Sequence, residues 1–301
     1  MKQFRGTGVA LVTPFRNGKI DFADLGRIIE YNIDNGVDYL VSLGTTGEAV
    51  NLSERECQEI LRFTVKTANN RVPVVAGLFG DNNTTRLVDR LNRYDLTGIA
   101  AVMSASPHYV KPNQEGIYRH FMEVAKASPL PIILYNVPGR TSSNMSAATT
   151  LRLAKASKKF IAIKEASGDI VQATKIIKEK PEDFLVISGD DPTALGMIAC
   201  GGDGVISVIG NAFPAQFSDM IKAALNGDFA TAAKLNLQLI NIHDWLYVDG
   251  NPTGIKAALE VLGFCSHEVR LPLAPMSQPN FNQLKKEIDK ALLLSAVKVS
   301  V

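Results

Sequence analysis

A lysine interrupts an apolar run in the segment FIAIKEASGD, which begins at Phe160. Side chains alternate along a strand. If Lys164 points into a sheet or barrel, Ala162 and Phe160 do so as well, and Ile161 and Ile163 face outward. A lysine at a strand end can also extend its aliphatic stem to the solvent. The spacing leaves both interpretations open.

A buried lysine has a definite chemistry. Desolvation lowers the pKa of such an amine, and a shift of about three units corresponds to about 4 kcal/mol that the fold must supply. The neutral amine attacks a ketone and forms a Schiff base. The iminium then acts as an electron sink, so the neighbouring carbon can lose a proton and become a nucleophile. Lys164 is therefore our candidate nucleophile.

Schiff-base chemistry needs proton carriers, and the sequence offers several. Tyr135 precedes an NVP turn, Thr45 and Thr46 follow another apolar run, and Tyr109 lies in the segment SPHYVKPNQEG. A tyrosine–threonine–tyrosine chain can pass protons between a substrate and water. Each tyrosine alone also fits a half-buried ring with a satisfied hydroxyl, and the threonines alone fit a turn.

Arg140 follows Pro138 and Gly139, close to Tyr135. A guanidinium at this place can hold a carboxylate through two parallel hydrogen bonds. Hydrogen bonds to charged groups contribute about 1.5–3 kcal/mol. A surface arginine in a loop salt bridge is the alternative interpretation.

Eight short apolar runs recur along the chain, separated by segments with helical periodicity. They are mostly unalternated, which is typical of strands buried on both faces of a parallel sheet. Eight such units predict a (β/α)8 TIM barrel. A doubly wound sheet is the rival, but the first run lacks its glycine-rich fingerprint. The runs are GVALVTPF, YLVSLGTTGE, PVVAGLFG, GIAAVMSASP, PIILYNVP, FIAIKEASG, FLVISGDD and GVISVIGN.

The sequence also predicts where some helices begin near these runs. Asp21 is a candidate N-cap, Ser53 and Glu56 form a candidate capping box, and Asp191 with Pro192 suggests a cap followed by an N1 proline. The strand pattern stops after about Gly227. We therefore predict a catalytic barrel over residues 1–226 and a C-terminal helical extension over 227–301 that packs on it.

The composition excludes several classes. A formal net charge of +2 and the lack of a basic run argue against nucleic acid. No stretch reaches the roughly 18 apolar residues of a membrane span, and Pro14 and Arg16 interrupt any signal-peptide core. The three cysteines lack paired spacing, and we interpret them as buried apolar residues. The four histidines lack metal-ligand spacing. We expect a cytoplasmic protein without a metal or organic cofactor.

Five motifs together resemble one family. GTTGE, YNVPGRT, IKEASGD, SGDD and GVISV, in this order and spacing, resemble the dihydrodipicolinate synthase branch of the pyruvate-dependent aldolase and N-acetylneuraminate lyase superfamily. The resemblance covers essentially the whole chain. It implies a (β/α)8 barrel with a helical extension, usually a tetramer. It also implies condensation of pyruvate with aspartate-β-semialdehyde to 4-hydroxy-tetrahydrodipicolinate, in diaminopimelate and lysine biosynthesis.

The resemblance implies a role for each site residue, by its position in these motifs. Lys164 would form the Schiff base, Tyr135 would be the neighbouring acid/base, and Thr46 its relay partner. Tyr109 would complete the relay from a neighbouring subunit. Further residues would bind substrate: Thr45 and the backbone of Thr46 the pyruvate carboxylate, Arg140 the carboxylate of the second substrate, and Gly189 and Ile206 the pocket through backbone groups.

Two departures and two alternatives remain. The positions matching the lysine-inhibition cleft of many members are Glu54, Cys57, Asn82, Arg86 and His108. Inhibited members tend to have histidines at the first two, an acid at the fourth and a tyrosine at the last, and this chain differs at all four. Because Arg86 would repel an ammonium group, we predict weak or absent inhibition by lysine. The segment AGLFGDNN also differs from the shorter glycine-rich turn usual there. The alternatives are a related 2-keto acid aldolase, such as an N-acetylneuraminate lyase-like enzyme, and a catalytically silent barrel that binds a keto acid.

Overall fold

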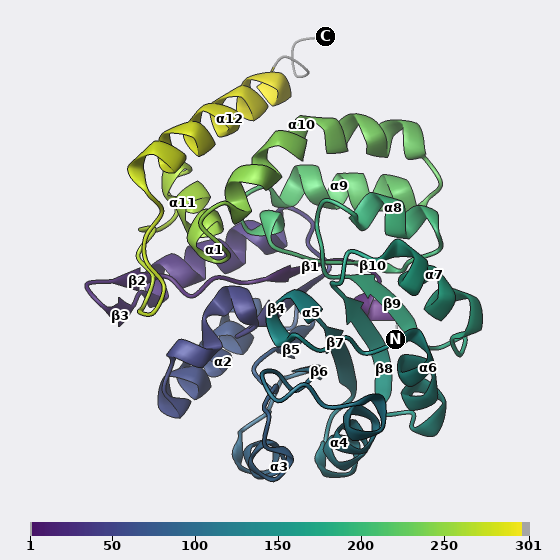
Figure 1. Cartoon of the computed structure of the whole chain (residues 1–301). Helices are drawn as coiled ribbons and strands as arrows, with labels where there is room; N and C mark the ends of the chain where they lie inside the picture. Colours follow the sequence, from purple (N-terminus) through teal and green to yellow (C-terminus); the bar gives the residue numbers. More distant parts are fainter. Residues whose placement is uncertain (1, 297–301) are drawn as a thin grey trace.

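Eight parallel strands close into a barrel, as the sequence predicts. The computed structural model describes residues 2–296, and Figure 1 shows helices surrounding the strands. The order of hydrogen-bonded neighbours is β1-β10-β9-β8-β7-β6-β5-β4, with β4 returning to β1. The strands are β1 (Gly6–Ala10), β4 (Tyr39–Ser42), β5 (Val74–Ala76), β6 (Ala101–Ala105), β7 (Ile132–Asn136), β8 (Phe160–Glu165), β9 (Leu185–Ser188) and β10 (Gly204–Ser207).

Helices follow the strands and cover the barrel (Figure 1). The helices of the barrel are α1 (Phe22–Asp34), α2 (Glu54–Ala68), α3 (Thr84–Arg93), α4 (Gln114–Ala127), α5 (Pro138–Thr141), α6 (Ala147–Ala156), α7 (Ile170–Glu179), α8 (Ala194–Ala199) and α9 (Pro214–Leu225). A small antiparallel hairpin, β2 (Phe15–Arg16) with β3 (Lys19–Ile20), follows β1. Short 3-10 turns are η1 (Lys2–Phe4), η2 (Thr45–Gly47), η3 (Ala49–Asn51) and η4 (Ile209–Asn211).

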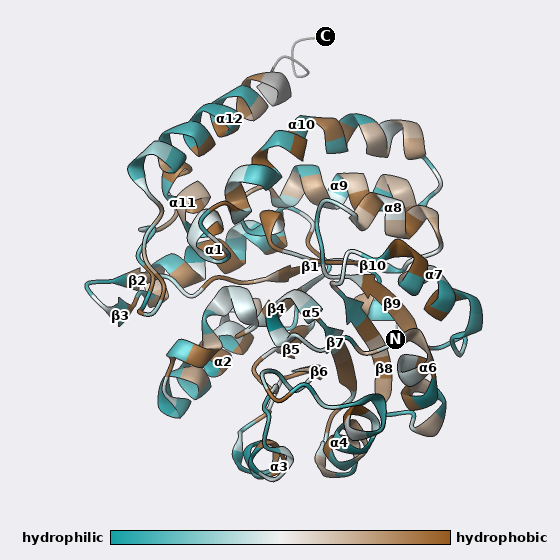
Figure 2. Ribbon diagram, viewed as in Figure 1, coloured by the Kyte–Doolittle hydropathy of each residue, from teal (hydrophilic) through white to brown (hydrophobic). Residues whose placement is uncertain are grey.

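The core has two layers because side chains alternate along each strand. One cluster fills the barrel and includes Val41, Met103 and Ile187. The other lies between the strands and the helices and includes Leu40 and Val102. The strands are accordingly apolar along most of their length, as the brown β8 and β9 ribbons in Figure 2 show. Both faces of the sheet are therefore buried, which explains the unalternated runs in the sequence.

A β-bulge corrects the expected alternation of β8. Ile132 pairs with Phe160 and Ile133 with Ala162, so Ile161 is the extra residue. Phe160 consequently lies in the outer cluster, and Ile161 joins Ala162 inside the barrel. The prediction that Phe160 points inward was wrong. The bulge precedes Ala162, so the inward direction of Lys164 is unaffected.

Two of the predicted helix caps are confirmed and one is wrong. Asp21 accepts a hydrogen bond from the N–H of Asp24, and the capping box of Ser53 and Glu56 is complete. Helix α8 begins at Ala194, after Asp191 and Pro192. The carboxylate of Asp191 instead accepts the N–H groups of Val208 and Ile209, beyond the end of β10. These two donors replace the expected helix N-terminus.

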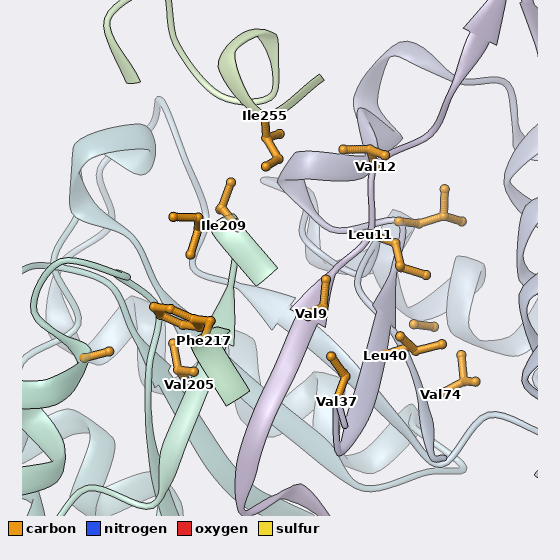
Figure 3. Packing of buried hydrophobic residues seen from close by; sticks show 14 of the residues in the cluster. Val9, Leu11, Val12, Val37, Leu40, Val74, Val205, Ile209, Phe217 and Ile255 are labelled. Carbon is orange, nitrogen blue, oxygen red and sulfur yellow. The ribbon is translucent and has the colours of Figure 1, made fainter. Parts of the chain in front are cut away.

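Between α9 and residue 296, the last that the structure describes, the only regular elements are helices, as predicted. They are α10 (Phe229–Tyr247), α11 (Thr253–Val261) and α12 (Gln278–Ala296). Helix α10 lies between α9 and α12 (Figure 1). Figure 3 shows Ile255 of α11 at the same end of the barrel as Ile209 and Val12, and all three are buried in one cluster. The division into domains at residue 226 stays a prediction.

Two further expectations concern the cysteines and membrane-spanning helices. Cys57 and Cys265 are buried, but Cys200, at the end of α8, is exposed, so the interpretation of this third cysteine was wrong. Its place at a surface helix end, rather than on a core-facing position, explains the difference. None of the helices in residues 2–296 combines the length and apolar character that a membrane span requires.

Candidate active site

Lys164 and Tyr135 lie directly opposite each other at the carboxyl ends of β8 and β7. They are register partners in the parallel ladder, and they are 4% and 6% exposed. The Nζ atom of Lys164 lies 4.4 Å from the centre of the Tyr135 ring. Within residues 2–296 the amine has no carboxylate partner in an ion pair. It is therefore not held by a counter-ion and can attack a carbonyl carbon.

Gly189 makes room for the lysine side chain. A Cβ atom at this position would lie 2.9 Å from both Cγ and Cε of Lys164, and 2.6 Å from Cβ of Ala166. The N–H of Gly189 donates to the carbonyl of Glu165 at 2.7 Å, which holds the glycine against the end of β8. Only glycine fits at this position while the Lys164 side chain keeps its conformation.

Thr46 lies on the 3-10 turn η2, which follows β4, and is 2% exposed. Its Oγ1 accepts a hydrogen bond from Asn251 Nδ2 at 3.1 Å. Thr45, next to it on the turn, is half-buried. Thr46 is thus held by a residue 205 positions further along the chain.

Arg140 lies on the short helix α5, after β7, and is exposed. Its Nη2 donates to the backbone oxygen of Asn251 at 3.2 Å. Asn251 therefore contacts both Thr46 and Arg140 and joins two of the predicted site residues. Since the side chain of Arg140 forms no ion pair among the described residues, its charge is available to an anion.

Two more predicted residues have different surroundings. Ile206 is fully buried on β10 and belongs to the inner cluster that also contains Tyr135. Tyr109 is 86% exposed, after β6, and has a φ of 64°. The structure therefore brings Lys164, Tyr135 and Gly189 together and links Thr46 to Arg140. It leaves Tyr109 on the surface of the single chain.

Sequence reasoning missed a buried ion pair beside Thr46. Glu48 and Lys256 are fully buried, and their carboxylate and amine lie 2.5 Å apart. Glu48 has a φ of 53°, directly after η2, and Lys256 lies on α11. A lysine within the apolar stretch GIKAALEVL was a usable signal, of the same kind as Lys164.

Asn251 and Glu165 were also missed as site-supporting residues. Asn251 had no local signal, because its partner is remote in the sequence. Glu165 directly follows Lys164, and its burial is visible only once β8 is placed between β7 and β9. No group of three or more metal-ligating side chains occurs in the described part of the chain.

These features define a class: a (β/α)8 barrel with a buried lysine amine next to a tyrosine at the strand ends. A profile described as the Dihydrodipicolinate synthetase family matches residues 3–291. This chain belongs to that family.

Individual relatives support this assignment to the family. The 4-hydroxy-tetrahydrodipicolinate synthase of Flavobacterium psychrophilum is 51% identical over 285 residues, covering 94% of this chain and 97% of that protein. That of Koribacter versatilis is 43% identical over 300 residues, 99% of each chain. The crystal structure of dihydrodipicolinate synthase from Aquifex aeolicus superposes with a TM-score of 0.92 at 39% identity, covering 95% of this chain and 98% of that one.

Proposed function

We propose that this chain is a 4-hydroxy-tetrahydrodipicolinate synthase, a lyase that condenses pyruvate with aspartate-β-semialdehyde in diaminopimelate and lysine biosynthesis. The observation that carries the proposal is the amine of Lys164, buried against the Tyr135 ring and without a carboxylate partner within residues 2–296. Relatives that carry this name, one of them 51% identical, support it.

The reaction begins with attack of the Lys164 amine on the keto carbon of pyruvate. A C–N bond forms, the oxygen leaves as water, and the iminium results. A proton then leaves the methyl carbon, and the electron pair of that C–H bond forms an enamine. The enamine carbon attacks the aldehyde, whose oxygen takes up a proton. Tyr135, whose ring centre lies 4.4 Å from the amine, is the acid/base.

The remaining residues bind and relay. Thr46 passes protons between Tyr135 and Tyr109, and Tyr109 comes from a neighbouring copy of the chain. The pyruvate carboxylate is bound by Thr45 and the backbone of Thr46, and the pocket is lined by backbone groups of Gly189 and Ile206. Arg140 binds the carboxylate of the aldehyde substrate. Its positive charge, without an ion-pair partner among the described residues, supports an anionic aldehyde over the neutral sugar aldehyde of a sugar-acid lyase.

Exposed apolar side chains support an oligomer. Val50, Tyr109 and Val110 are 93%, 86% and 60% exposed, and burying such side chains against a second copy is favourable. We propose a homotetramer, a dimer of dimers, in the cytoplasm. One solved relative is described as a monomeric dihydrodipicolinate synthase variant; it has a TM-score of 0.93 at 35% identity, covering 96% of this chain and 97% of that one. Light scattering of the intact protein would measure the assembly.

Lysine inhibition is proposed to be weak or absent. The guanidinium of Arg86 donates to both oxygens of Asp81, at 2.7 and 2.6 Å. The carboxylate of Asp81 is therefore engaged, and an incoming ammonium group meets a cation beside it. A lysine titration of the assay described next measures this, and complete inhibition by lysine would contradict it.

A steady-state assay tests the function. Pyruvate and aspartate-β-semialdehyde are supplied together, and product formation is followed. Turnover with this pair, and slower turnover with a neutral aldehyde, supports the synthase. Turnover only with a sugar acid would favour the N-acetylneuraminate lyase-like alternative. Binding of a keto acid without turnover would favour the silent barrel.

A further inference from the structure

Behind Lys164 and Tyr135 lies a second pair of side chains, Glu165 and Asn136, on the same two strands. Asn136 and Glu165 are register partners, one residue beyond Tyr135 and Lys164. Because side chains alternate along a strand, this second pair faces the helices while the first faces the barrel. Glu165 and Asn136 are both fully buried. The reaction steps described above use neither of them.

The Glu165 carboxylate is saturated by neutral donors. Asn136 Nδ2 lies 3.1 Å from Oε1 and 2.9 Å from Oε2. The N–H of Ser167 donates to Oε1 at 2.8 Å, and Gln172 Nε2 donates to Oε2 at 3.0 Å. No cation pairs with it among residues 2–296. A buried carboxylate is unfavourable unless it is fully hydrogen-bonded, and a fully satisfied buried network fixes a geometry.

Asn136 is fixed as firmly as its partner. Its Nδ2 also lies 2.8 Å from Oδ1 of Asn144, and its Oδ1 accepts the N–H of Met145 at 2.9 Å. Asn144 in turn exchanges hydrogen bonds with Gln172 of α7. The network therefore joins β7, β8, the loop after α5 and the first turn of α7.

The link between Asn136 and Glu165 acts on the reacting side chains through the strands that they share. The N–H of Ala166 donates to the carbonyl of Asn136 at 2.9 Å, which extends the ladder past the last paired residues. The hydrogen bonds from Asn136 to Glu165 hold the two strand ends at a fixed separation. Lys164 and Tyr135 project from these same two strand ends, and the Lys164 amine lies 4.4 Å from the centre of the Tyr135 ring.

We propose that Glu165 is a positioning residue for the reaction and acts through Asn136 on the alignment of Lys164 with Tyr135. This proposal rests on the proposed function, because it takes Lys164 to be the Schiff-base lysine. In this proposal Glu165 does not contact the substrate. Its part is to keep the acid/base and the amine at the distance from which both act on the same carbon.

The variant Glu165→Gln tests the proposal. It keeps the shape of the side chain but replaces one oxygen by an NH2 group, which meets an N–H donor whichever way the amide lies. We expect the rate at which borohydride traps a pyruvate adduct on Lys164, and kcat, to fall at least about tenfold, since small misplacements of reacting groups cost up to about a hundredfold. The KM for the aldehyde should change by less than about threefold, because Arg140 lies on another element.

Gln172→Ala is the matched control. It removes a donor to the same carboxylate from α7 and leaves the link between the strands intact. It should lose some thermal stability and trap pyruvate at the wild-type rate. A partial recovery of trapping when Asn136→Asp is added to Glu165→Gln would further support the proposal, since the acceptor and donor then exchange strands.

Three outcomes decide the matter. Folded Glu165→Gln that traps pyruvate at the wild-type rate would overturn the proposal. If Glu165→Gln does not fold, Asn136→Ala, which removes the cross-strand donor alone, takes its place with the same criterion. Absence of any adduct on the wild-type protein would instead reject the proposed function itself, and the two failures are thereby distinguished.

Discussion

Lys164 and Arg140 have opposite surroundings, and each suits its part in the proposed reaction. The Lys164 amine is buried against the Tyr135 ring, where a covalent adduct is shielded from water. Arg140 is exposed at the strand ends and is tied to the backbone oxygen of Asn251 at 3.2 Å. In the proposed reaction, Lys164 forms a bond to the substrate and Arg140 recruits an anion.

Arg140→Ala should weaken binding of the second substrate without affecting the reaction with pyruvate. Loss of hydrogen bonds to a charged group, about 1.5–3 kcal/mol, predicts that kcat/KM for aspartate-β-semialdehyde falls by roughly 10- to 150-fold. Borohydride trapping of pyruvate on Lys164 should be unchanged. Steady-state kinetics with each substrate varied in turn measures both effects. An unaltered KM for the aldehyde would show that Arg140 binds no carboxylate.

At the scale of elements, the strands were predictable and their local irregularities were not. Seven of the eight barrel strands fall within the apolar runs, and β1 overlaps its run but begins two residues earlier, at Gly6. Burial on both faces leaves a strong sequence signal. The bulge at Ile161 has no such signal, since any residue of an apolar run can be the extra one. The cap at Asp191 failed for a related reason: its carboxylate bonds to Val208 and Ile209, which are remote in the sequence.

Gly189→Ala should displace the side chain of Lys164 without unfolding the barrel. The added methyl group would meet Cγ and Cε of Lys164 at 2.9 Å, and overpacking of this kind costs about 1–3 kcal/mol. We expect borohydride trapping to slow by about tenfold or more. Gly139→Ala is the control, because its added Cβ would have no neighbour within 4 Å. Equal trapping by both variants would contradict the tight fit at Gly189.

The contact between α3 and α4 predicts a pH-dependent stability. His120 is 6% exposed, and its Nδ1 lies 2.9 Å from Oγ1 of Thr84. Burial lowers the pKa of His120 from 6.5 to about 4. Between these values the unfolded chain binds a proton that the folded chain does not. The free energy of unfolding should therefore fall as the pH drops through this window, by up to about 3 kcal/mol.

Urea unfolding at about pH 7 and about pH 4.5 checks this dependence. His120→Gln should reduce the difference in unfolding free energy between the two pH values. His108→Gln, at an exposed position, controls for loss of a histidine from the chain. If His120→Gln keeps the full wild-type difference, the buried neutral histidine is not its cause.

At the scale of the molecule, the helical extension takes part in the site. Asn251 reaches Thr46, and Lys256 of α11 reaches Glu48, two residues further on. These partners are separated by 205 and 208 residues. Contacts between residues this far apart in the sequence cannot be predicted from local sequence patterns. The extension could therefore be predicted to be helical, but its contacts with the candidate site could not be predicted.

Breaking the buried pair should destabilise the whole chain. Lys256 Nζ also donates to the carbonyl of Glu268 at 2.8 Å, so Lys256→Met leaves the carboxylate of Glu48 buried without its charged partner. Removal of one member of such a pair costs about 3–5 kcal/mol. Lys285→Met breaks an exposed pair with Asp289 and should cost at most about 1 kcal/mol. Denaturant unfolding compares the two, and equal losses would contradict the role of the Glu48–Lys256 pair.

The proposed function depends on a reactive, buried amine at Lys164. The most direct measurement is to incubate the protein with pyruvate, reduce it with borohydride and map the mass gain by peptide mass spectrometry, with Lys164→Ala as the control. We predict an adduct on Lys164 alone and none in the variant. A folded protein that gains no mass, or gains it on another lysine, would contradict the account and favour a barrel that binds a keto acid without reacting.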